Sequence, residues 1–292
     1  MTTGHDATGR TGAVGLAGLG NLGAPVARRI AATGWDLTVF DRVPERAGDV
    51  PGAAAATSLD DVLDRDVLVL VVPDDRAVES LLLGPDGYLA RAAGAARPRT
   101  VVVHSTILPA TAQQLARHAA EAGVGFLDAP VSGGSERAEN GSLTVFLGAE
   151  PDHVEPVRTL LGDVAASVEH VGAPGAGAAV KLANQLMLFA ALGGVHEGLA
   201  LAARFGVEEA DLLRCVGTST GASWSTDNWG FFDETARSYN RNGTPVRDRP
   251  WGKDLLEVLE AARSVDLAMP VAATASQTVA RYVEDHARLG ER

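Results

Sequence analysis

Short apolar runs alternate with helical patterns through the first 173 residues. The runs are rich in Val and Leu, and they lie at residues 13–17, 36–40, 67–72, 99–104 and 125–127. Helical patterns occupy residues 24–33 and 109–122. Apolar runs of this length are typical of parallel strands that crossover helices cover on both faces. We therefore predict an α/β sheet domain over residues 13–173, completed by strands at 143–147 and 167–171 around a helix at 152–161.

One long apolar stretch, residues 174–206, organises the rest of the chain. After its opening glycines it has no proline, and its large apolar residues recur at steps of three and four, which predicts one long, largely buried helix. Further helices are predicted at 207–216, 252–264 and 270–286. Residues 174–292 are therefore expected to form an all-helical second domain.

The stretch between residues 217 and 250 has a different composition, rich in Ser, Thr, Asn, Gly, Arg and aromatic residues. It contains Trp224 and Trp229, and Trp251 follows it directly. A set of loops that covers a substrate and simple irregular packing are both compatible with this composition, and the spacing does not decide between them.

Composition and charge limit the classes of partner. The chain has 292 residues and a formal net charge of −12, which argues against nucleic acid or an anionic membrane, because phosphate groups repel it. We expect no apolar run long enough to span a bilayer. The histidines lack metal-ligand spacing such as H-E-x-x-H, so no metal site is predicted.

The start of the chain and its cysteine content point to a cellular compartment. Residues 1–12 are polar and glycine-rich without the apolar core of a signal peptide, which predicts a disordered tail. The single cysteine, Cys215, excludes an internal disulfide and fits a reducing compartment, and its apolar helical context indicates a packing role. A soluble cytoplasmic protein is the expectation.

A glycine motif between the first strand and the first helix predicts dinucleotide binding. In G-x-G-x-x-G the first glycine makes a tight turn, the second lets backbone approach a pyrophosphate, and the third lets the helix pack on the strand. Free amides at the helix start then face the phosphates. The expected cofactor-binding residues here are Gly18, Leu19, Gly20, Asn21, Leu22 and Gly23.

The acidic residue after the second strand bears on the type of cofactor. Asp41 lies about 20 residues beyond the motif, where a carboxylate binds the adenosine ribose hydroxyl. A carboxylate repels a 2′-phosphate and so favours NAD. Arg42 beside it can pair with that phosphate or be an ordinary surface charge, so NADP remains possible.

Polar residues follow three further strands at the edge where ligands of open α/β sheets bind. Pro73 and Asp74 follow one strand, and Ser105 and Thr106 follow the next. After the third, Ser132 precedes Gly133 and Gly134, a sequence that exposes several backbone amides and suits a small carboxylate, although an ordinary glycine turn is the alternative.

Lys181 and Asn184 interrupt the long apolar helix near its start. At a spacing of three they share one helix face. A cation gains nothing from the helix dipole at this end, so either a snorkelling surface lysine or a functional lysine is indicated.

Taken in order, these motifs resemble the β-hydroxyacid dehydrogenase family, which includes 3-hydroxyisobutyrate dehydrogenase and tartronate semialdehyde reductase. The resemblance rests on GLGNLG at Gly18, FDR at Asp41, VVPDD around Val72, DAPVSGG at Asp128, KLANQ at Lys181 and KD at Lys253. It implies a Rossmann-like domain, a long interdomain helix, a helical domain that mediates dimers or tetramers, and an active site in the cleft between domains.

The same resemblance implies roles for individual residues. Lys181 is similar to the catalytic lysine and Asn184 to the residue that helps hold it and the substrate. Ser132, Gly133 and Gly134 match the element that grips the substrate carboxylate. Lys253 matches a late lysine that reaches both cofactor and substrate. The remaining expected cofactor-binding residues are Val72, Pro73, Asp74, Ala77 and Thr106.

Departures from the family leave the substrate open. Gln185 stands where many members have a second asparagine, and the stretch at residues 221–251 fits no subfamily. We expect hydride transfer between NAD(P) and a small aldehyde acid of the 3-hydroxyisobutyrate or tartronate semialdehyde type. Succinic semialdehyde, glyoxylate or a sulfonated aldehyde are alternatives, as is a non-catalytic dinucleotide-binding module.

Overall fold

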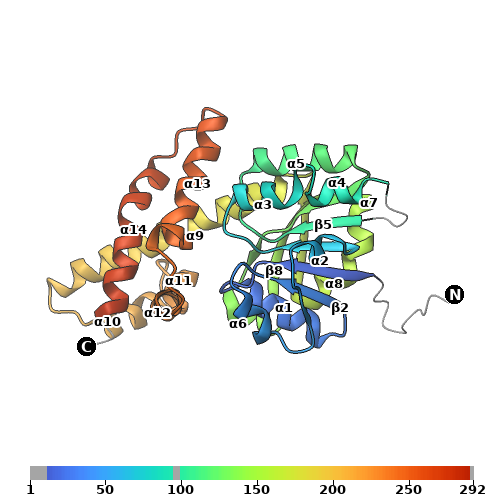
Figure 1. Ribbon diagram of the computed structural model, residues 1–292. Coiled ribbons are helices and arrows are strands. Elements are labelled where there is room, and N and C mark those ends of the chain that lie inside the picture. The colour runs from blue at the N-terminus through green and yellow to red at the C-terminus, as the bar shows by residue number, and fades with distance from the viewer. Residues whose placement is uncertain (1–11, 95–98, 290–292) are drawn as a thin grey trace. The chain divides into compact units, whose positions relative to one another are not determined.

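The computed structural model describes residues 12–94 and 99–289 (Figure 1). The predicted tail at residues 1–12 lies, apart from Gly12, outside these residues. The chain divides after Lys181 into two compact units. The sequence placed the boundary at residue 173, before the long helix. The division falls inside that helix instead because its first turns pack onto the sheet, where Ala178 is part of the apolar core.

The first unit is an α/β sheet with helices on its faces (Figure 1). Its strands are β1 Ala13–Ala17, β2 Asp36–Phe40, β3 Ala54–Ala55, β4 Val67–Leu70, β5 Arg99–Val103, β6 Val124–Asp128, β7 Val131–Ser132, β8 Leu143–Ala149 and β9 Ala165–Gly172. Its helices are α1 Gly23–Ala32, α2 Asp60–Leu63, α3 Asp75–Leu82, α4 Tyr88–Ala92, α5 Pro109–Glu121, α6 Gly134–Glu139, α7 Pro151–Val154 and α8 Arg158–Val164.

The strand order is β3-β2-β1-β4-β5-β6-β8-β7, with β9 paired to β8. The strands from β3 to β6 are parallel, and β8 runs antiparallel to both β6 and β7. The order reverses between β1 and β4, because the chain moves outward from β1 to β2 and then returns to its other side. In an open parallel sheet this switch point is where ligands bind.

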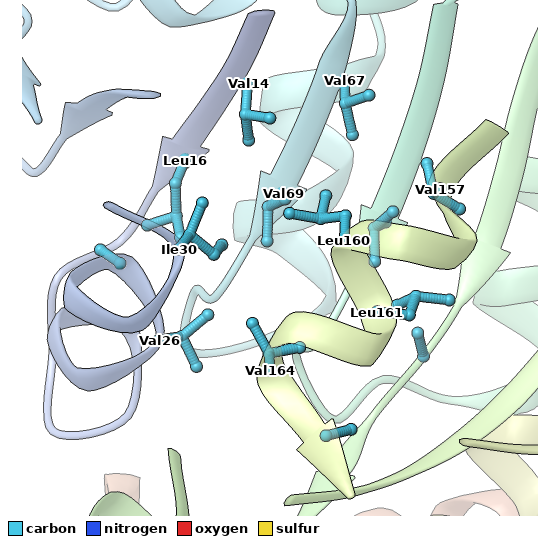
Figure 2. Close-up of a cluster of buried hydrophobic side chains, with 14 of the residues drawn as sticks. Val14, Leu16, Val26, Ile30, Val67, Val69, Val157, Leu160, Leu161 and Val164 are labelled. Carbon is cyan, nitrogen blue, oxygen red and sulfur yellow. The ribbon is translucent and has the colours of Figure 1, made fainter. Parts of the chain in front are cut away.

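Two apolar clusters hold the helices on the sheet. Figure 2 shows the first, in which Val26 and Ile30 of α1 and Leu160 of α8 point toward Leu16 and Val69 of the strands. All five side chains are nearly or fully buried. The alternation of buried runs and amphipathic helices in the sequence produces these layers, so the predicted α/β class is confirmed.

The predicted helix at residues 152–161 is wrong in its continuity. The structure breaks it into α7, a 3-10 helix at Glu155–Val157, and α8. Pro156 accounts for the break, because proline lacks the N–H that an unbroken helix would need. The other predicted strands and helices of this unit differ from the observed ones only at their ends.

The second unit is helical, as predicted. It comprises most of α9 Ala176–Ala203, followed by α10 Glu209–Val216, α11 Trp224–Asp227, α12 Phe231–Arg241, α13 Pro250–Ser264 and α14 Pro270–Leu289. Its apolar core joins Phe189 of α9, Phe232 of α12, Leu255 of α13 and Val279 of α14. The stretch at residues 217–250 therefore contains the helices α11 and α12, which neither a set of loops nor irregular packing predicted.

Trp251 and Trp229 pack within the helical unit, whereas Trp224 is 43% exposed. Trp251 is 1% exposed and donates from its Nε1 to Glu284. Trp229 packs against His196 and His286, with ring centroids 5.1 Å apart in both pairs. Trp224 contacts Phe231 edge-on. Trp251 thus belongs to the core and does not form a pocket wall.

Helix α9 is much less buried than predicted. It has the length and composition of a membrane-spanning helix, with a mean hydropathy of 1.6 over its best window, yet only 11% of that window is buried. The expectations of a largely buried helix and of no run long enough to span a bilayer are both wrong. Cys215 is likewise exposed, because α10 has no buried residue, and its predicted packing role is wrong within this chain.

Candidate active site

The glycine loop has the geometry that its sequence predicts. Gly18 has a φ of +99°, and a Cβ there would lie 2.2 Å from the Val71 carbonyl oxygen. A Cβ on Gly23 would lie 1.9 Å from the Gly18 carbonyl oxygen, so α1 starts in direct contact with the turn. Above Gly20 nothing lies within 4 Å of a Cβ position. The loop therefore offers open space at the point where a pyrophosphate approaches the backbone.

The start of α1 fits the same group. Leu22 at the N-cap makes no side-chain capping bond, and no acidic residue lies in the first turn. A helix start without carboxylates attracts a phosphate through its partial positive charge. The remaining residues of the motif, Leu19 and Asn21, lie in the same loop.

Asp41 is fixed to the glycine loop by hydrogen bonds. Its Oδ2 accepts from the Leu19 N–H at 2.7 Å, and its Oδ1 accepts from the Val43 N–H at 2.8 Å. Arg46 lies 3.4 Å from Oδ1, whereas the neighbouring Arg42 is exposed. The sequence considered Arg42 and missed Arg46, whose 3-10 helix, Pro44–Asp49, brings it back toward the carboxylate.

The ends of the central strands are linked across the sheet. Gly18 N donates to Phe40 O, Val71 N donates to Ala17 O, and His104 N donates to Leu70 O, all within 3.0 Å. Each strand end is thereby held level with its neighbour by backbone bonds. The loops that carry the candidate residues consequently emerge together at one edge of the sheet.

The loop after β4 is held by side chains of neighbouring loops. Val72 N donates to Ser105 Oγ at 2.8 Å. Asp74 caps α3, since its Oδ1 accepts from Ala77 N at 2.9 Å. The Asp74 side chain thus has a structural partner. Pro73 between them is exposed, while Thr106 is half-buried.

His104 is neutral in this edge. Its Nδ1 lies 2.6 Å from the carbonyl oxygen of Ala129, and because a carbonyl only accepts, Nδ1 carries the hydrogen. Burial lowers its pKa. His104 therefore ties the loop after β5 to the loop after β6 without adding a charge.

The segment after β6 forms the candidate carboxylate site. Ser132 ends β7 and pairs with Thr144 of β8. Gly133 and Gly134 have φ values of +136° and +77°, a backbone that other residues rarely adopt. All three are half-buried. The positive φ angles set the two glycines apart from an ordinary strand end and begin α6.

Asp128 connects this segment to the long helix. Its Oδ1 accepts from Gly175 N and its Oδ2 from Ala178 N, both at 2.8 Å. It is 0% exposed, and burial raises its pKa to about 6 despite these hydrogen bonds. The carboxylate thus caps α9. The sequence quoted Asp128 only as the start of a motif and missed this role.

Lys181 lies one turn beyond the contact between α9 and the sheet. A Cβ on Gly177 would lie 2.4 Å from Phe146 O of β8 and 2.7 Å from Asp128 O of β6. Residues four apart share a helix face, so Lys181 continues the face that meets the sheet. It is 8% exposed, which rules out the interpretation of a snorkelling surface lysine within this chain.

Asn184 and Lys253 belong to the second unit, where a polar chain links them. Asn184 Nδ2 donates to Gln185 Oε1 at 3.1 Å, and Gln185 Nε2 donates to Asp254 Oδ2. Asp254 Oδ1 lies 3.0 Å from Lys253 Nζ, which also meets Glu257 at 2.9 Å. Burial disfavours the Lys253 ammonium, but the two carboxylates outweigh it and raise its pKa.

The structure thus gathers the predicted residues into two sets. The first unit holds Gly18 to Gly23, Asp41, Val72 to Ala77, Thr106, Ser132 to Gly134 and Lys181. The second holds Asn184 and Lys253. Among the described residues no group of three His, Cys, Asp or Glu side chains could hold a metal ion. The residues that sequence reasoning missed are Arg46, Asp128, Gln185 and Asp254.

Comparisons with known proteins match the two parts of the chain separately. Residues 13–172 match the model for the NAD binding domain of 6-phosphogluconate dehydrogenase. Residues 175–290 match the model for the NAD-binding region of NADP-dependent 3-hydroxyisobutyrate dehydrogenase. The two models meet where α9 begins.

Individual relatives cover nearly the whole chain. The 3-hydroxyisobutyrate dehydrogenase of Pseudomonas aeruginosa is 33% identical over 90% of this chain and 89% of that protein. The NAD-dependent L-serine dehydrogenase of the same organism is 32% identical over 90% of this chain and 89% of that protein. The solved structure of Mycobacterium tuberculosis 3-hydroxyisobutyrate dehydrogenase with L-serine has a TM-score of 0.77 and 26% identity, and covers 95% of each chain. The chain therefore belongs to the β-hydroxyacid dehydrogenase family and is an NAD(P)-dependent oxidoreductase that acts on CH–OH groups.

Proposed function

We propose that this chain interconverts a small β-hydroxyacid and its aldehyde acid, of the 3-hydroxyisobutyrate or tartronate semialdehyde type, with Lys181 as general acid and base. The observation that carries the proposal is the burial of Lys181 on the α9 face that Asp128 and Gly177 hold against the sheet. Burial of an ammonium group costs free energy unless hydrogen bonds or opposite charges compensate it, so lysine is an uncommon residue at such a position.

The use of basic residues in the whole chain supports this role. Of the 25 Lys and Arg residues, only Lys181 and Lys253 are lysine. Arginine does not lose its proton in proteins, whereas an amine can give and take one. A chain that uses arginine nearly everywhere else thus has lysine at the buried position where proton transfer is proposed.

The proposed roles of the residues follow from their chemistry. When bound, the nicotinamide supplies or accepts the hydride. Ser132 and the amides of Gly133 and Gly134 bind the substrate carboxylate and so fix the reacting carbon. During reduction Lys181 Nζ donates a proton to the carbonyl oxygen as charge develops there, and during oxidation the neutral amine accepts the hydroxyl proton. Asn184, one turn along α9, contacts the lysine or the same oxygen.

The proposal includes a preference for NAD. Asp41 is tied to the loop by two backbone N–H groups, so its charge stays where an adenosine 2′-phosphate would be repelled. Arg46 beside it and the exposed Arg42 keep NADP possible, because either guanidinium could pair with a phosphate.

L-Serine is a second candidate substrate. It is also a small β-hydroxyacid, and it is named both in an L-serine dehydrogenase relative and in the related solved structure. Succinic semialdehyde, glyoxylate and sulfonated aldehydes remain alternatives, together with a non-catalytic dinucleotide-binding module. A binding module would have no use for both a buried lysine and a segment suited to a carboxylate, which disfavours it.

We further propose that the enzyme is a cytoplasmic homodimer or homotetramer assembled through its helical unit. Large apolar side chains stand exposed there, with Met187, Leu201 and Phe205 exposed by 65%, 64% and 80%. Patches of this kind mark interaction sites, and a second copy is the occupant that a family of oligomers favours. The exposed thiol of Cys215 fits a reducing compartment. Light scattering of the purified protein tests the assembly.

The test of the activity is a substrate panel. The purified chain is followed by NAD(P)H absorbance with 3-hydroxyisobutyrate, L-serine, tartronate semialdehyde, succinic semialdehyde and glyoxylate, using each cofactor in turn. Turnover of one β-hydroxyacid or aldehyde acid that disappears in Lys181→Ala is expected. Tight cofactor binding without turnover on any member would favour the binding module instead.

A further inference from the structure

The polar chain from Asp254 through Gln185 to Asn184 has a fixed direction. Asp254 is 2% and Gln185 4% exposed, so neither exchanges partners freely with water. Asp254 lies 3.0 Å from the Lys253 ammonium, and a carboxylate paired in this way can only accept hydrogen bonds. Gln185 must therefore present its NH₂ group to Asp254, as it does.

The orientation of the Gln185 amide in turn determines the orientation of the Asn184 amide. With its NH₂ committed to Asp254, Gln185 presents Oε1 on its other edge, and this oxygen accepts from Asn184 Nδ2 at 3.1 Å. A carboxamide can be turned end for end, so its partners decide which atom lies where. The Asn184 NH₂ is thus directed to Gln185, and its Oδ1 lies on the opposite edge of the amide.

We infer that Asp254 and Gln185 are positioning residues that make Asn184 present a hydrogen-bond acceptor on the face of α9 that it shares with Lys181. This inference rests on the proposed function. An acceptor at that place suits the amine of Lys181, which only donates when protonated. Held by Asn184 Oδ1, a protonated Lys181 keeps another N–H for the substrate oxygen, and a neutral Lys181 keeps its lone pair for the substrate hydroxyl.

This series of hydrogen bonds also disfavours the reversed orientation of the Asn184 amide. If Asn184 were reversed, its Oδ1 would meet Gln185 Oε1, and two acceptors would face each other in a largely buried environment. Gln185 could not turn to relieve this, since its Oε1 would then meet the Asp254 carboxylate. The orientation of the Asn184 amide is therefore decided two hydrogen bonds away, by the charge of Asp254.

Gln185→Met is the first test, because methionine matches glutamine in size but cannot relay a hydrogen bond. We expect kcat to fall about tenfold to a hundredfold, the scale of a misplaced catalytic group, with KM changed less than threefold. The melting temperature by circular dichroism reports folding. Unchanged kcat in a folded Gln185→Met protein would overturn the inference.

Asp254→Asn and Glu257→Gln form a matched pair. Each removes one negative charge beside Lys253, and Asp254 in addition accepts the hydrogen bond from Gln185. In Asp254→Asn the residue-254 amide can accept or donate, so Gln185 is no longer held in one direction, and we expect kcat to fall at least threefold further than in Glu257→Gln. Equal losses in the two variants would assign the effect to Lys253 and contradict the relay.

The sharpest test reverses the donor-to-acceptor direction of these hydrogen bonds. In Asn184→Asp a carboxylate faces Gln185 Oε1, and the loss of kcat should be large. Adding Asp254→Asn lets the residue-254 amide donate to Gln185, which can then turn and donate to the new carboxylate. We expect the double variant, at its own pH optimum, to recover at least threefold in kcat over Asn184→Asp, although it carries one more substitution.

The outcomes separate this inference from the proposed function. Loss of activity in Lys181→Ala together with full activity in Gln185→Met, or with no recovery in the double variant, would overturn the relay alone. Retained activity in Lys181→Ala would overturn the acid and base role of the lysine, and the relay with it. A purely structural role for Gln185 would lower the melting temperature in all variants without recovery in the reversed pair.

Discussion

The two units hold their candidate residues in different ways. In the first unit the backbone positions them: Gly18, Gly23 and Gly177 each lie where a Cβ would overlap a carbonyl oxygen. In the second unit side chains position them, through Asn184, Gln185 and Asp254. A backbone-built region depends on the absence of side-chain atoms, whereas a side-chain-built region depends on which atoms donate and which accept.

Lys181 lies on α9 between the backbone-positioned Gly177 and the side-chain-positioned Asn184, and substitutions there have the largest expected effect. In Lys181→Arg the positive charge remains, but the group no longer gives up its proton. We expect kcat to fall by about a hundredfold to ten-thousandfold, the range for a positioned acid or base, nearly as much as in Lys181→Ala. Near-normal turnover of the arginine variant, measured by NAD(P)H absorbance, would reduce the role of Lys181 to that of a fixed charge.

Gly23→Ala and Gly20→Ala compare two glycines of one loop. The new Cβ at position 23 would lie 1.9 Å from Gly18 O, whereas the one at position 20 meets nothing within 4 Å. We expect Gly23→Ala to lower the free energy of unfolding by about 3 kcal/mol or more. Gly20→Ala should melt like the parent protein but bind NAD(P)H more weakly, as measured by fluorescence titration. Equal melting temperatures for the two variants would refute the backbone-built description.

Asp128→Asn tests a side chain of the first unit that holds a helix start in place, because Asp128 accepts from backbone N–H groups at the start of α9. An amide cannot accept from both Gly175 N and Ala178 N, so we expect a loss of about 1–3 kcal/mol in the free energy of unfolding. Asp74→Asn is the control, since asparagine caps a helix as well as aspartate, and α3 should keep its stability.

The pH dependence of stability gives Asp128 a second signature. Burial raises its pKa in the folded protein to about 6 from the ordinary 3.8 of an aspartate. A raised pKa means that the folded state binds the proton more tightly than the unfolded chain. The contribution of Asp128 to stability is thus complete below about pH 4 and is lost as pH rises toward 6. Denaturant unfolding between these pH values should show this decline in the parent protein, and Asp128→Asn should lack it.

The smallest expected effect is that of Asp41→Ser on the preference for NADPH over NADH. Without the carboxylate, Arg46 and Arg42 face the adenosine ribose without competition, so the ratio of kcat/KM for NADPH over NADH should rise roughly tenfold, about 1.4 kcal/mol. Arg42→Ala is the control and should shift the ratio far less, because Arg42 is exposed. A parent protein that already prefers NADPH would contradict the NAD assignment.

Local patterns predicted the first unit well because its determinants are local. Gly18 needs a positive φ, Gly23 meets the Gly18 carbonyl oxygen within the same loop, and Asp41 follows its strand directly. The resemblance to the family then pointed to Lys181, Ser132 and Lys253. Pro156 also indicated a helix break, but the regular spacing of the apolar residues around it predicted one continuous helix.

The sequence by itself determined the order of strands and helices, the dinucleotide loop and the candidate lysine. Only the tertiary structure decided that Asp128 caps α9 and that Asp254 orients Gln185, because these partners lie 47 and 69 positions apart along the chain. Arg46 lies only 5 positions from Asp41, and the 3-10 helix that contains it brings the two side chains together. The tertiary structure also decided that much of α9 is exposed, since burial depends on which other elements are present to cover an apolar face. Periodicity reports that a face is apolar, and packing alone determines what covers it.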